Sequence, residues 1–327
     1  MVERPDLSIV APMYNELENI ASTIEKITRA MEGFAGTWEL IIVNDGSNDG
    51  SFEKAAECAA DLNNVHVTGY EQNRGRGAAL RTGFQAARAR IVATVDFDLS
   101  YSPDHILRMY RLLMERGDVD VVMASAYMPG GSVQGVPWGR LAVSRLGNLV
   151  LRAAFRGAFH TTTCIVRAYR REVLEALPLE SDRKEIHLEI LSKALTLGFK
   201  VVEMPATLKA RARGAAKFAF LRTSMTHLFF AVAERPTLLG AGLGALILVV
   251  TALNCIWVAG GWRGKALEAS GHLLLAAGSL VAGAAVAAAV WLIGALISRQ
   301  RQALTRVQSR VTFLERQSQS TRDDGEQ

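Results

Sequence analysis

Two aspartates, Asp96 and Asp98, follow an apolar run in the segment IVATVDFDLSYSP, residues 91–103. Side chains alternate along a strand, so residues two apart face the same side if the extended conformation persists. Two carboxylates held together repel each other, and a bound cation is the usual reason for such a pair. The other interpretation is a solvated strand end before a Ser-Pro turn, because a single pair with this spacing also arises by chance.

The elements that would position these aspartates are short apolar runs that alternate with segments of helical periodicity. The predicted strands are residues 7–11, 38–44, 64–69, 91–96 and 120–124, and the predicted helices are residues 17–31, 51–62, 77–89 and 104–116. Strands that alternate with helices predict an α/β fold, with a mostly parallel sheet covered on both faces. Ligands of such sheets bind beyond the carboxyl ends of the strands.

Polar loops follow the first four predicted strands: APMYNE, NDGSNDG, EQNRGRG and DFDLS. We therefore expect these loops to face one cleft. The Gly-rich loop lacks the dinucleotide fingerprint, because Leu80 stands three residues after Gly77 and the loop follows the third strand. A Gly-rich turn that opens a helix still offers backbone N–H groups to an anion, so this turn is a candidate for phosphate binding. The sequence has no Walker lysine motif and does not support ATPase chemistry.

Two long apolar segments, residues 238–259 and 272–297, carry almost no charge, and each is long enough for a helix to cross a bilayer. The polar segment between them is short, so we predict a transmembrane hairpin whose ends emerge on one side. Basic residues are more abundant outside the hairpin than in its loop, which places the N-terminal domain and the tail in the cytoplasm. The first residues lack the apolar core of a signal peptide, and we expect a multi-pass protein of the inner (cytoplasmic) membrane.

Composition argues against several classes of protein. The three cysteines form no CxxC pair, which disfavours a zinc ribbon or a disulfide scaffold. The formal net charge of +5 is modest, and basic residues cluster beside the apolar segments. This distribution favours anionic lipid headgroups or phosphate substrates over nucleic acid as partners.

Three further segments have amphipathic patterns. Residues 132–160 change from irregular to helical, with arginines between apolar positions, and we expect them at a charged surface or as a solvated helix face. Residues 217–235 carry four phenylalanines between basic ends and predict an interfacial helix, with core packing as the alternative. Heptad-like spacing in the tail allows a homo-oligomer, although a frayed helix with a disordered end is preferred; the apolar positions are Ile297, Leu304, Val307, Val311 and Leu314.

Six motifs occur in order along the chain: SIVAPMYNELENI, VNDGSNDGS, NRGRGAALRTGF, VDFDLSYSPDHI, GGSVQGVPWGR and CIVRAYRREVLEAL. Together, over residues 6–217, they resemble the polyprenyl-phosphate glycosyltransferases related to dolichol-phosphate mannose synthase, which are inverting enzymes with a GT-A fold. A two-span anchor also occurs in bacterial members. The resemblance implies a nucleotide-sugar donor (a UDP- or GDP-hexose), Mg²⁺ or Mn²⁺, and a polyprenyl phosphate acceptor. The implied organisation is a GT-A domain (1–216), a juxtamembrane amphipathic helix (217–236), a transmembrane hairpin (237–298) and a polar tail (299–327).

The resemblance assigns roles in the donor half position by position. Pro12, Tyr14 and Glu16 correspond to the loop that holds the nucleobase and ribose, and Asp45 corresponds to the aspartate that contacts the nucleoside.

Asp96 and Asp98 correspond to the catalytic metal-binding pair, with Asp98 as the expected direct ligand of Mg²⁺ or Mn²⁺. The cation would bridge the donor diphosphate and neutralise it as it leaves. Arg76, Asp96 and Arg145 are further candidates for contact with the donor.

The acceptor phosphate has a second pKa of about 6, so its oxygen is already anionic near neutral pH and hardly needs a general base. It needs cations that hold it in position. The candidates are Arg140, Arg145, Arg167 and Lys217, the last in a segment that resembles the family's RxxGxSK. The implied reaction is a single displacement that inverts the anomeric carbon.

The sequence departs from the family pattern mainly in the acceptor half. Ala126 stands where relatives often have Arg, Thr161 and Ile165 replace an Asp and a Gly, and Ala216 replaces a Ser. In the donor half, Asn44 stands where many relatives have Asp. Either the acceptor phosphate is held differently, or the acceptor or sugar is unusual, or activity is reduced.

Three other functions are considered. A processive polysaccharide synthase would require a QxxRW-type motif and more spans, and QGVPWGR is not that motif. A catalytically weak membrane scaffold would bind nucleotide-sugar without turnover, and only the acceptor-half departures favour it. A sugar-phosphate nucleotidylyltransferase is disfavoured, because the Gly-rich segment expected after its first strand is missing.

Overall fold

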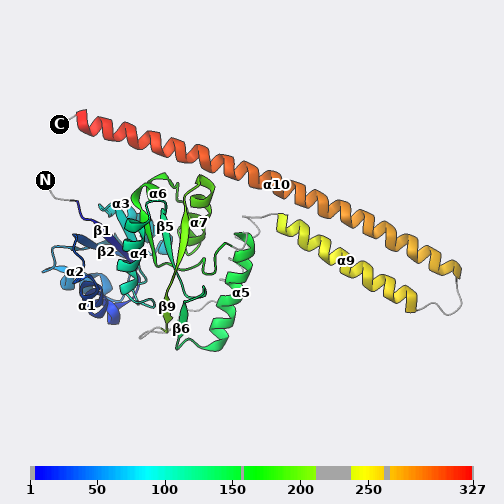
Figure 1. The fold of residues 1–327 in the computed structure, drawn as a ribbon, viewed down its shortest axis with the longest axis horizontal. Helices are drawn as coiled ribbons and strands as arrows, with labels where there is room; N and C mark the ends of the chain where they lie inside the picture. The colour runs from blue at the N-terminus through cyan, green and yellow to red at the C-terminus, as the bar shows by residue number, and fades with distance from the viewer. Residues whose placement is uncertain (1–3, 156–157, 211–236, 261–265, 326–327) are drawn as a thin grey trace. The chain divides into compact units, whose positions relative to one another are not determined.

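The computed structural model describes residues 4–155, 158–210, 237–260 and 266–325 (Figure 1). The chain divides into two compact units, Met1–His227 with Thr305–Gln327, and Leu228–Leu304. The first unit contains the sheet. The second contains α9 (Thr237–Gly260) and the first part of α10 (Ala266–Gly325). The predicted juxtamembrane helix, residues 217–236, lies outside the described residues.

The core of the first unit is a seven-stranded sheet in the order β3-β2-β1-β4-β7-β5-β8. All neighbouring strands are parallel except β7, which runs antiparallel to β4 and β5. The mostly parallel α/β sheet predicted from the sequence is therefore confirmed. The strands are β1 (Leu7–Met13), β2 (Trp38–Asp45), β3 (Val65–Tyr70), β4 (Ile91–Thr94), β5 (Val121–Ser125), β7 (Arg167–Arg170) and β8 (Val201–Pro205), with β6 (Ser132–Gln134) and β9 (Thr207–Lys209) as a separate parallel pair.

The helices of this unit pack on the sheet, with α3 against β1 and β2 and α4 against β5 and β7. Each element predicted within residues 7–124 is present, with ends that differ by at most three residues. The helical elements are η1 (Leu17–Asn19), α1 (Ile20–Met31), α2 (Ser51–Ala59), α3 (Arg76–Ala86), α4 (Asp104–Glu115), α5 (Trp138–Ala154), α6 (Arg171–Ala176) and α7 (Ile186–Leu197).

The central strands are buried along nearly their whole length. In β1, β2, β4 and β5 almost every residue is buried. Because successive side chains of a strand point to opposite faces, continuous burial means that both faces of the sheet are covered. The sheet is therefore a rigid support for the loops at its carboxyl edge.

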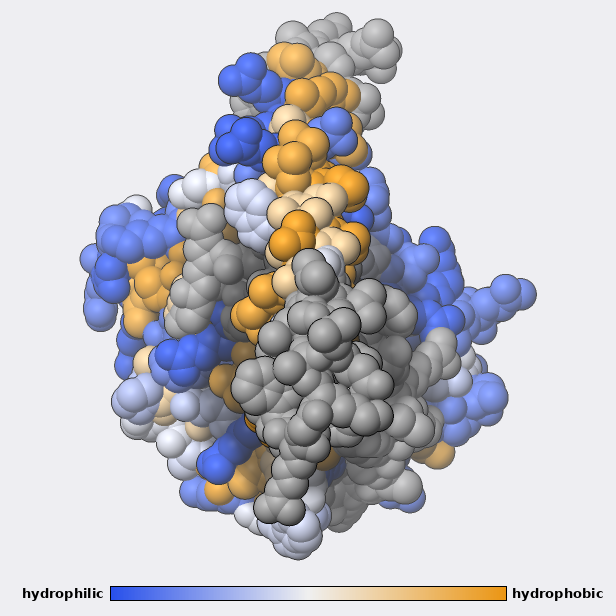
Figure 2. Space-filling model, turned by 90° about the vertical axis from the view of Figure 1, so that its right-hand side faces the viewer, coloured by the Kyte–Doolittle hydropathy of each residue, from blue (hydrophilic) through white to orange (hydrophobic). Residues whose placement is uncertain are grey.

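The second unit is helical, as the two apolar segments predict. Among the described residues, one helical segment, Leu280–Val311, is long and apolar enough to cross a membrane, and a shorter apolar stretch runs over Gly242–Leu253 in α9. Figure 2 shows apolar residues along α10 in orange, with hydrophilic residues beside them toward the upper end. α10 continues to Gly325, so the predicted disordered end is helical up to that residue. The two-span hairpin remains a prediction.

Candidate active site

The polar loops at the carboxyl edge of the sheet are joined to one another. Asn15, after β1, accepts the backbone N–H of Asn48 on its Oδ1 and donates its own N–H to Ser47 Oγ, both over 3.0 Å. The N–H of Glu16 donates to Ser51 Oγ over 3.0 Å. Asn15 adopts a φ of 54°, a left-handed conformation that Asn tolerates better than most residues. The loops after β1 and β2 therefore form one layer, as the sequence predicts.

The residues assigned to the nucleobase and ribose lie in this layer. Tyr14 exposes 38% of its surface, and Pro12 and Glu16 beside it are half-buried. Glu16 Oε2 accepts a hydrogen bond from Asn19 Nδ2 over 2.6 Å, which fixes the carboxylate at the start of α1. An exposed aromatic ring next to a fixed carboxylate can stack on a base and accept hydroxyl hydrogen bonds. The nucleoside role of these residues remains a prediction.

Asp45, at the end of β2, holds the loop after β3. Its carboxylate accepts the Tyr70 hydroxyl at 2.7 Å, Asn73 Nδ2 at 3.0 Å, and the backbone N–H groups of Arg74 and Gly75 at 2.9 and 2.8 Å. Burial, together with the hydrogen bond to Asp45, raises the pKa of Tyr70. Asp45 is only 4% exposed, so its observed role is to position the loop. A direct contact with the nucleoside remains a prediction.

The Gly-rich turn at the start of α3 does not offer the N–H groups of Gly77 and Ala78 to a ligand, so the prediction that these groups bind a phosphate is wrong. The N–H groups of Gly77 and Ala78 donate to the carbonyl of Asp182, at 2.7 and 3.2 Å. A Cβ on Gly77 would lie 2.2 Å from the carbonyl oxygen of Ser181, so glycine is required for this close approach. The glycines bring a backbone carbonyl to the helix N-terminus in place of a phosphate.

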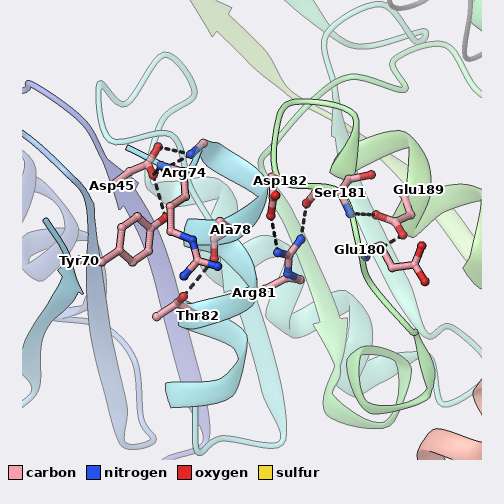
Figure 3. Close-up of polar contacts among 11 residues, drawn as sticks. Asp45, Tyr70, Arg74, Ala78, Arg81, Thr82, Glu180, Ser181, Asp182 and Glu189 are labelled. Atoms are coloured by element: carbon pink, nitrogen blue, oxygen red, sulfur yellow. Dashed lines mark hydrogen bonds and ion pairs between the residues drawn. The ribbon is translucent and has the colours of Figure 1, made fainter. Parts of the chain in front are cut away.

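The loop that supplies this carbonyl, residues 178–183, is held between α3 and α7 (Figure 3). Arg81 on α3 donates to the Ser181 carbonyl and forms an ion pair with the Asp182 carboxylate. Glu189 on α7 accepts the backbone N–H groups of Glu180 and Ser181, both over 2.9 Å. We call residues 178–183 the strut loop, because they tie α3 to α7.

Asp96 and Asp98 lie in a turn and not on a strand. β4 ends at Thr94, and the Leu99 N–H donates to the Asp96 carbonyl over 3.0 Å. Asp98 Oδ1 accepts the N–H and the hydroxyl of Ser100, at 3.0 and 2.6 Å. Leu99 has a φ of 49°, which is uncommon for a residue other than glycine. The extended conformation on which the predicted alignment of the two carboxylates depended does not persist beyond Thr94, and the turn fixes the directions of the two side chains.

Cationic side chains stand close to Asp96. Arg76, at the start of α3, forms an ion pair with it over 3.2 Å. Lys184, just after the strut loop, lies near both: desolvation and the positive charge of Arg76 lower its pKa, whereas Asp96 opposes that shift. A diphosphate placed here would meet both cations. No local sequence signal marks Lys184, because its neighbours in space come from distant segments.

The chemistry of this turn fits a divalent metal shared with a substrate. No cluster of three or more His, Cys, Asp or Glu suited to a metal occurs in the described part of the chain. Mg²⁺ is usually bound by one or two carboxylates together with substrate phosphates and water. Asp96 and Asp98 supply that number of carboxylates, with Arg76 beside them for a phosphate.

A cavity of about 440 Å³ lies between α5 and the segment after β5; we call it the α5 cavity. Its lining includes the cationic side chains of Arg145 and Arg152, the imidazole of His160, and the apolar side chains of Leu141 and Leu149. The guanidinium of Arg145 lies 6.0 Å from the centre of the Tyr127 ring. Asn148 ties the walls together, because its Oδ1 accepts the N–H of Thr162 over 2.9 Å.

The predicted amphipathic helix is α5. Trp138, Leu146 and Leu149 expose 85%, 62% and 62% of their surfaces. Arg140 and Arg145 are exposed on the same helix. Lys217, also assigned to the acceptor, lies outside the described residues.

Arg167 is not placed to bind an acceptor phosphate, so its sequence-based assignment is corrected. The side chain is fully buried on β7. Its guanidinium donates to the carbonyls of Cys164 and His187, each over 2.8 Å, and of Thr162 over 2.6 Å. These bonds make Arg167 a structural support for the segment before β7.

Two of the departures from the family pattern lie around the α5 cavity. Ala126 lines it without contributing a charge. The hydroxyl oxygen of Thr161 accepts from Ser125 Oγ over 2.8 Å and from the Tyr127 N–H over 3.3 Å. Sequence reasoning missed His160, which lines the cavity and pairs with Glu203, because the two residues are 43 positions apart.

Comparison with known proteins identifies the family. Residues 8–177 match the model described as glycosyl transferase family 2. The polyprenol monophosphomannose synthase of Mycolicibacterium smegmatis is 33% identical over 233 residues, which cover 69% of this chain and 85% of that protein. The undecaprenyl-phosphate 4-deoxy-4-formamido-L-arabinose transferase of Pectobacterium atrosepticum is 31% identical over 220 residues, which cover 66% of this chain and 64% of that protein.

Among solved structures, glucosyl-3-phosphoglycerate synthase of Mycobacterium tuberculosis, in complex with Mn²⁺, UDP and glucosyl-3-phosphoglycerate, has a TM-score of 0.55. The two are 22% identical, and the similarity covers 70% of this chain and 80% of that one. At this identity the similarity concerns the fold. The chain thus belongs to glycosyl transferase family 2, and it is a glycosyltransferase with a GT-A fold.

Proposed function

We propose that the enzyme transfers a sugar from a nucleotide-sugar donor to the phosphate of a membrane-bound polyprenyl phosphate. The observation that carries this proposal is the α5 cavity, which places Arg145 and Arg152 beside Leu141 and Leu149. Such a lining suits a ligand that joins a phosphate to an apolar chain. The names of relatives support the same acceptor class: polyprenol monophosphate in one and undecaprenyl phosphate in the other.

On the donor side, we propose that Asp96 and Asp98 hold Mg²⁺ or Mn²⁺ together with the diphosphate of a UDP- or GDP-sugar. When bound, the cation neutralises the charge that develops on the leaving diphosphate. Arg76 and Lys184 add positive charge beside Asp96. The exposed ring of Tyr14 lies in the loop layer proposed to receive the nucleoside. The Mn²⁺ and UDP in the solved structure of similar fold are consistent with this arrangement.

On the acceptor side, the proposed nucleophile is an oxygen of the polyprenyl phosphate. Arg145 and Arg152 would orient it, and Arg140 on the same helix adds to the positive field. The bond from this oxygen to the anomeric carbon forms as the bond from that carbon to the donor diphosphate breaks. Attack from the side opposite the leaving group inverts the configuration. Positioning and charge stabilisation supply most of the catalysis that such a reaction needs.

We further propose that α9 and the first part of α10 anchor the enzyme in the cytoplasmic membrane as a two-span hairpin. The 24 residues of α9 have a helical length of about 36 Å, enough for the ~30 Å hydrocarbon core. The exposed Trp138, Leu146 and Leu149 of α5 suit contact with the bilayer surface. A C-terminal fusion to green fluorescent protein tests the topology: fluorescence is expected, and a dark but full-length fusion would contradict a cytoplasmic tail.

The decisive experiment follows label from nucleotide sugars into lipid. Detergent-purified enzyme is incubated with polyprenyl phosphate, Mg²⁺ or Mn²⁺, and a panel of labelled UDP- and GDP-sugars. Transfer from one donor is expected. Asp98→Asn or EDTA should lower it by about 100-fold or more, because the charge stabilisation lost is several kcal/mol. Asp104→Asn is the matched control, since Asp104 is exposed and also accepts a serine hydroxyl.

The outcomes separate the parts of the proposal. Transfer that survives both EDTA and Asp98→Asn would contradict the metal assignment. If no sugar is transferred from any donor while nucleotide binding is intact, the proposed acceptor is contradicted. That result would favour the alternative hypothesis of a catalytically weak membrane scaffold.

A further inference from the structure

His160, in the wall of the α5 cavity, is oriented by a fixed carboxylate. Its Nδ1 lies 2.8 Å from Glu203 Oε2. The same carboxylate accepts the backbone N–H groups of His160 at 3.0 Å and Thr161 at 2.8 Å. Glu203 belongs to β8, which pairs with β5, so the sheet fixes its position. A carboxylate held in this way places a proton on Nδ1 and leaves Nε2 as the nitrogen that Glu203 does not use.

The groups around His160 favour an anion. Arg145 and Arg152 line the cavity from α5, Tyr127 lines it from the segment after β5, and Glu203 faces the ring from β8. The described residues that line the cavity include no Asp or Glu. An anion that enters therefore meets two guanidinium groups and the imidazole of His160, whose Nδ1 is paired with Glu203.

We propose that His160 binds the acceptor phosphate as an imidazolium whose charge is balanced by Glu203. This inference rests on the proposed function and adds a residue of the acceptor site that carries a proton. It also accounts for an acceptor site in which Ala126 supplies no charge. His160 would act as a binding and positioning residue, since it would contact the acceptor phosphate and not the anomeric carbon of the donor sugar.

The proton balance is simple. A phosphate monoester has a second pKa of about 6, so monoanion and dianion both occur near neutral pH. When the monoanion binds, its O–H bond breaks as an N–H bond forms on Nε2 of His160. When the dianion binds, the proton comes from water. Both routes give a dianion beside an imidazolium. The product diester carries one negative charge, and the proton returns to water as it leaves.

The test is a calorimetric titration of the full-length, detergent-purified enzyme with geranyl phosphate at pH 6.5 and pH 8.5. His160→Gln should weaken binding about tenfold at pH 6.5 and less than about twofold at pH 8.5, because histidine side chains change charge between pH 5 and 8. His66→Gln is the matched control: His66 Nε2 lies 3.8 Å from Glu39 Oε2, on β3 and away from the cavity lining. It should leave affinity unchanged at both pH values.

The outcomes distinguish this inference from the proposed function. Equal weakening by His160→Gln at both pH values, or none, would overturn the imidazolium role even if sugar transfer proceeds. A pH-dependent loss of binding in an enzyme that transfers no sugar would support the inference and contradict the proposed reaction. Inorganic phosphate that binds as tightly as geranyl phosphate would overturn the assignment of the site to a lipid. A melting curve for each variant confirms that it is folded.

Discussion

Replacement of Arg167 by glutamine should destabilise the fold and leave acceptor recognition unchanged. The buried guanidinium donates three hydrogen bonds to backbone carbonyls, those of Thr162, Cys164 and His187. Glutamine is shorter and cannot reach all three, and each buried carbonyl left without a donor costs about 1–3 kcal/mol. The expected loss in the free energy of unfolding is about 4 kcal/mol. For a domain of about 150–250 residues, this lowers the melting temperature by roughly 8–16 °C.

The assay is thermal unfolding of the purified enzyme, combined with the KM for polyprenyl phosphate measured well below the melting temperature. Arg170→Gln is the matched control: Arg170 also donates to carbonyls, of Val119 and Leu113, but is only half-buried. The Arg170→Gln enzyme should lose about 1–2 kcal/mol in the free energy of unfolding. An Arg167→Gln enzyme with an unchanged melting temperature and an acceptor KM raised tenfold would refute the structural role and restore Arg167 as a phosphate ligand.

Three further outcomes are expected. Asp45→Asn should lower the free energy of unfolding by about 3 kcal/mol, because it weakens several charge-assisted hydrogen bonds to the loop after β3. The KM for the nucleotide-sugar donor should also rise. An unchanged denaturant unfolding curve would contradict the role of Asp45 in holding this loop. Gly77→Ala should lower the free energy of unfolding by at least about 1–3 kcal/mol, because the added methyl group forces the strut loop away. The control is Gly139→Ala in α5, which has open space around it and should be neutral or stabilising. Equal melting temperatures for the two variants would contradict the tight contact at Gly77. Burial raises the pKa of Glu189, but hydrogen bonds from Lys193 and two backbone N–H groups outweigh it and lower the pKa below 4.5. Its contribution to stability is therefore complete above pH 4.5 and is lost as the pH falls through the lowered pKa. Glu189→Gln should flatten this part of the acid unfolding curve, and an unaltered curve would contradict the assignment.

The first 124 residues were predictable because their structural signals are local. Apolar runs and helical periodicity locate β1 to β5 and α1 to α4, and the parallel order places their polar loops at one edge. β7 was not predicted. Its four residues, RAYR, carry charged ends, and the strand enters the sheet between β4 and β5 in the opposite direction.

The parts of the site that sequence reasoning missed depend on contacts between distant segments. The Gly-rich turn has the composition of an anion-binding turn, but the Asp182 carbonyl occupies its N–H groups. In the sequence, Arg167 looks like a cation available to a phosphate, but in the structure its guanidinium donates to three backbone carbonyls. The pairing of His160 with Glu203 requires β8 to be in place. Residue types and spacing therefore identified the family and the carboxylate pair, whereas the partners of each charged group came from the tertiary structure.

The strut loop also bears on how the protein is made. Arg81 and its partner Asp182 are 101 residues apart, and at about 5–20 residues per second a ribosome needs roughly 5–20 s to synthesise that length. During this interval the N–H groups of Gly77 and Ala78 lack their acceptor, the Asp182 carbonyl. The family match ends at residue 177, so a nascent chain of that length contains the whole match and still lacks the strut loop. The contact between the strut loop and α3 can form only when residues beyond the matched segment have emerged, and a fragment trimmed to the match would lack it.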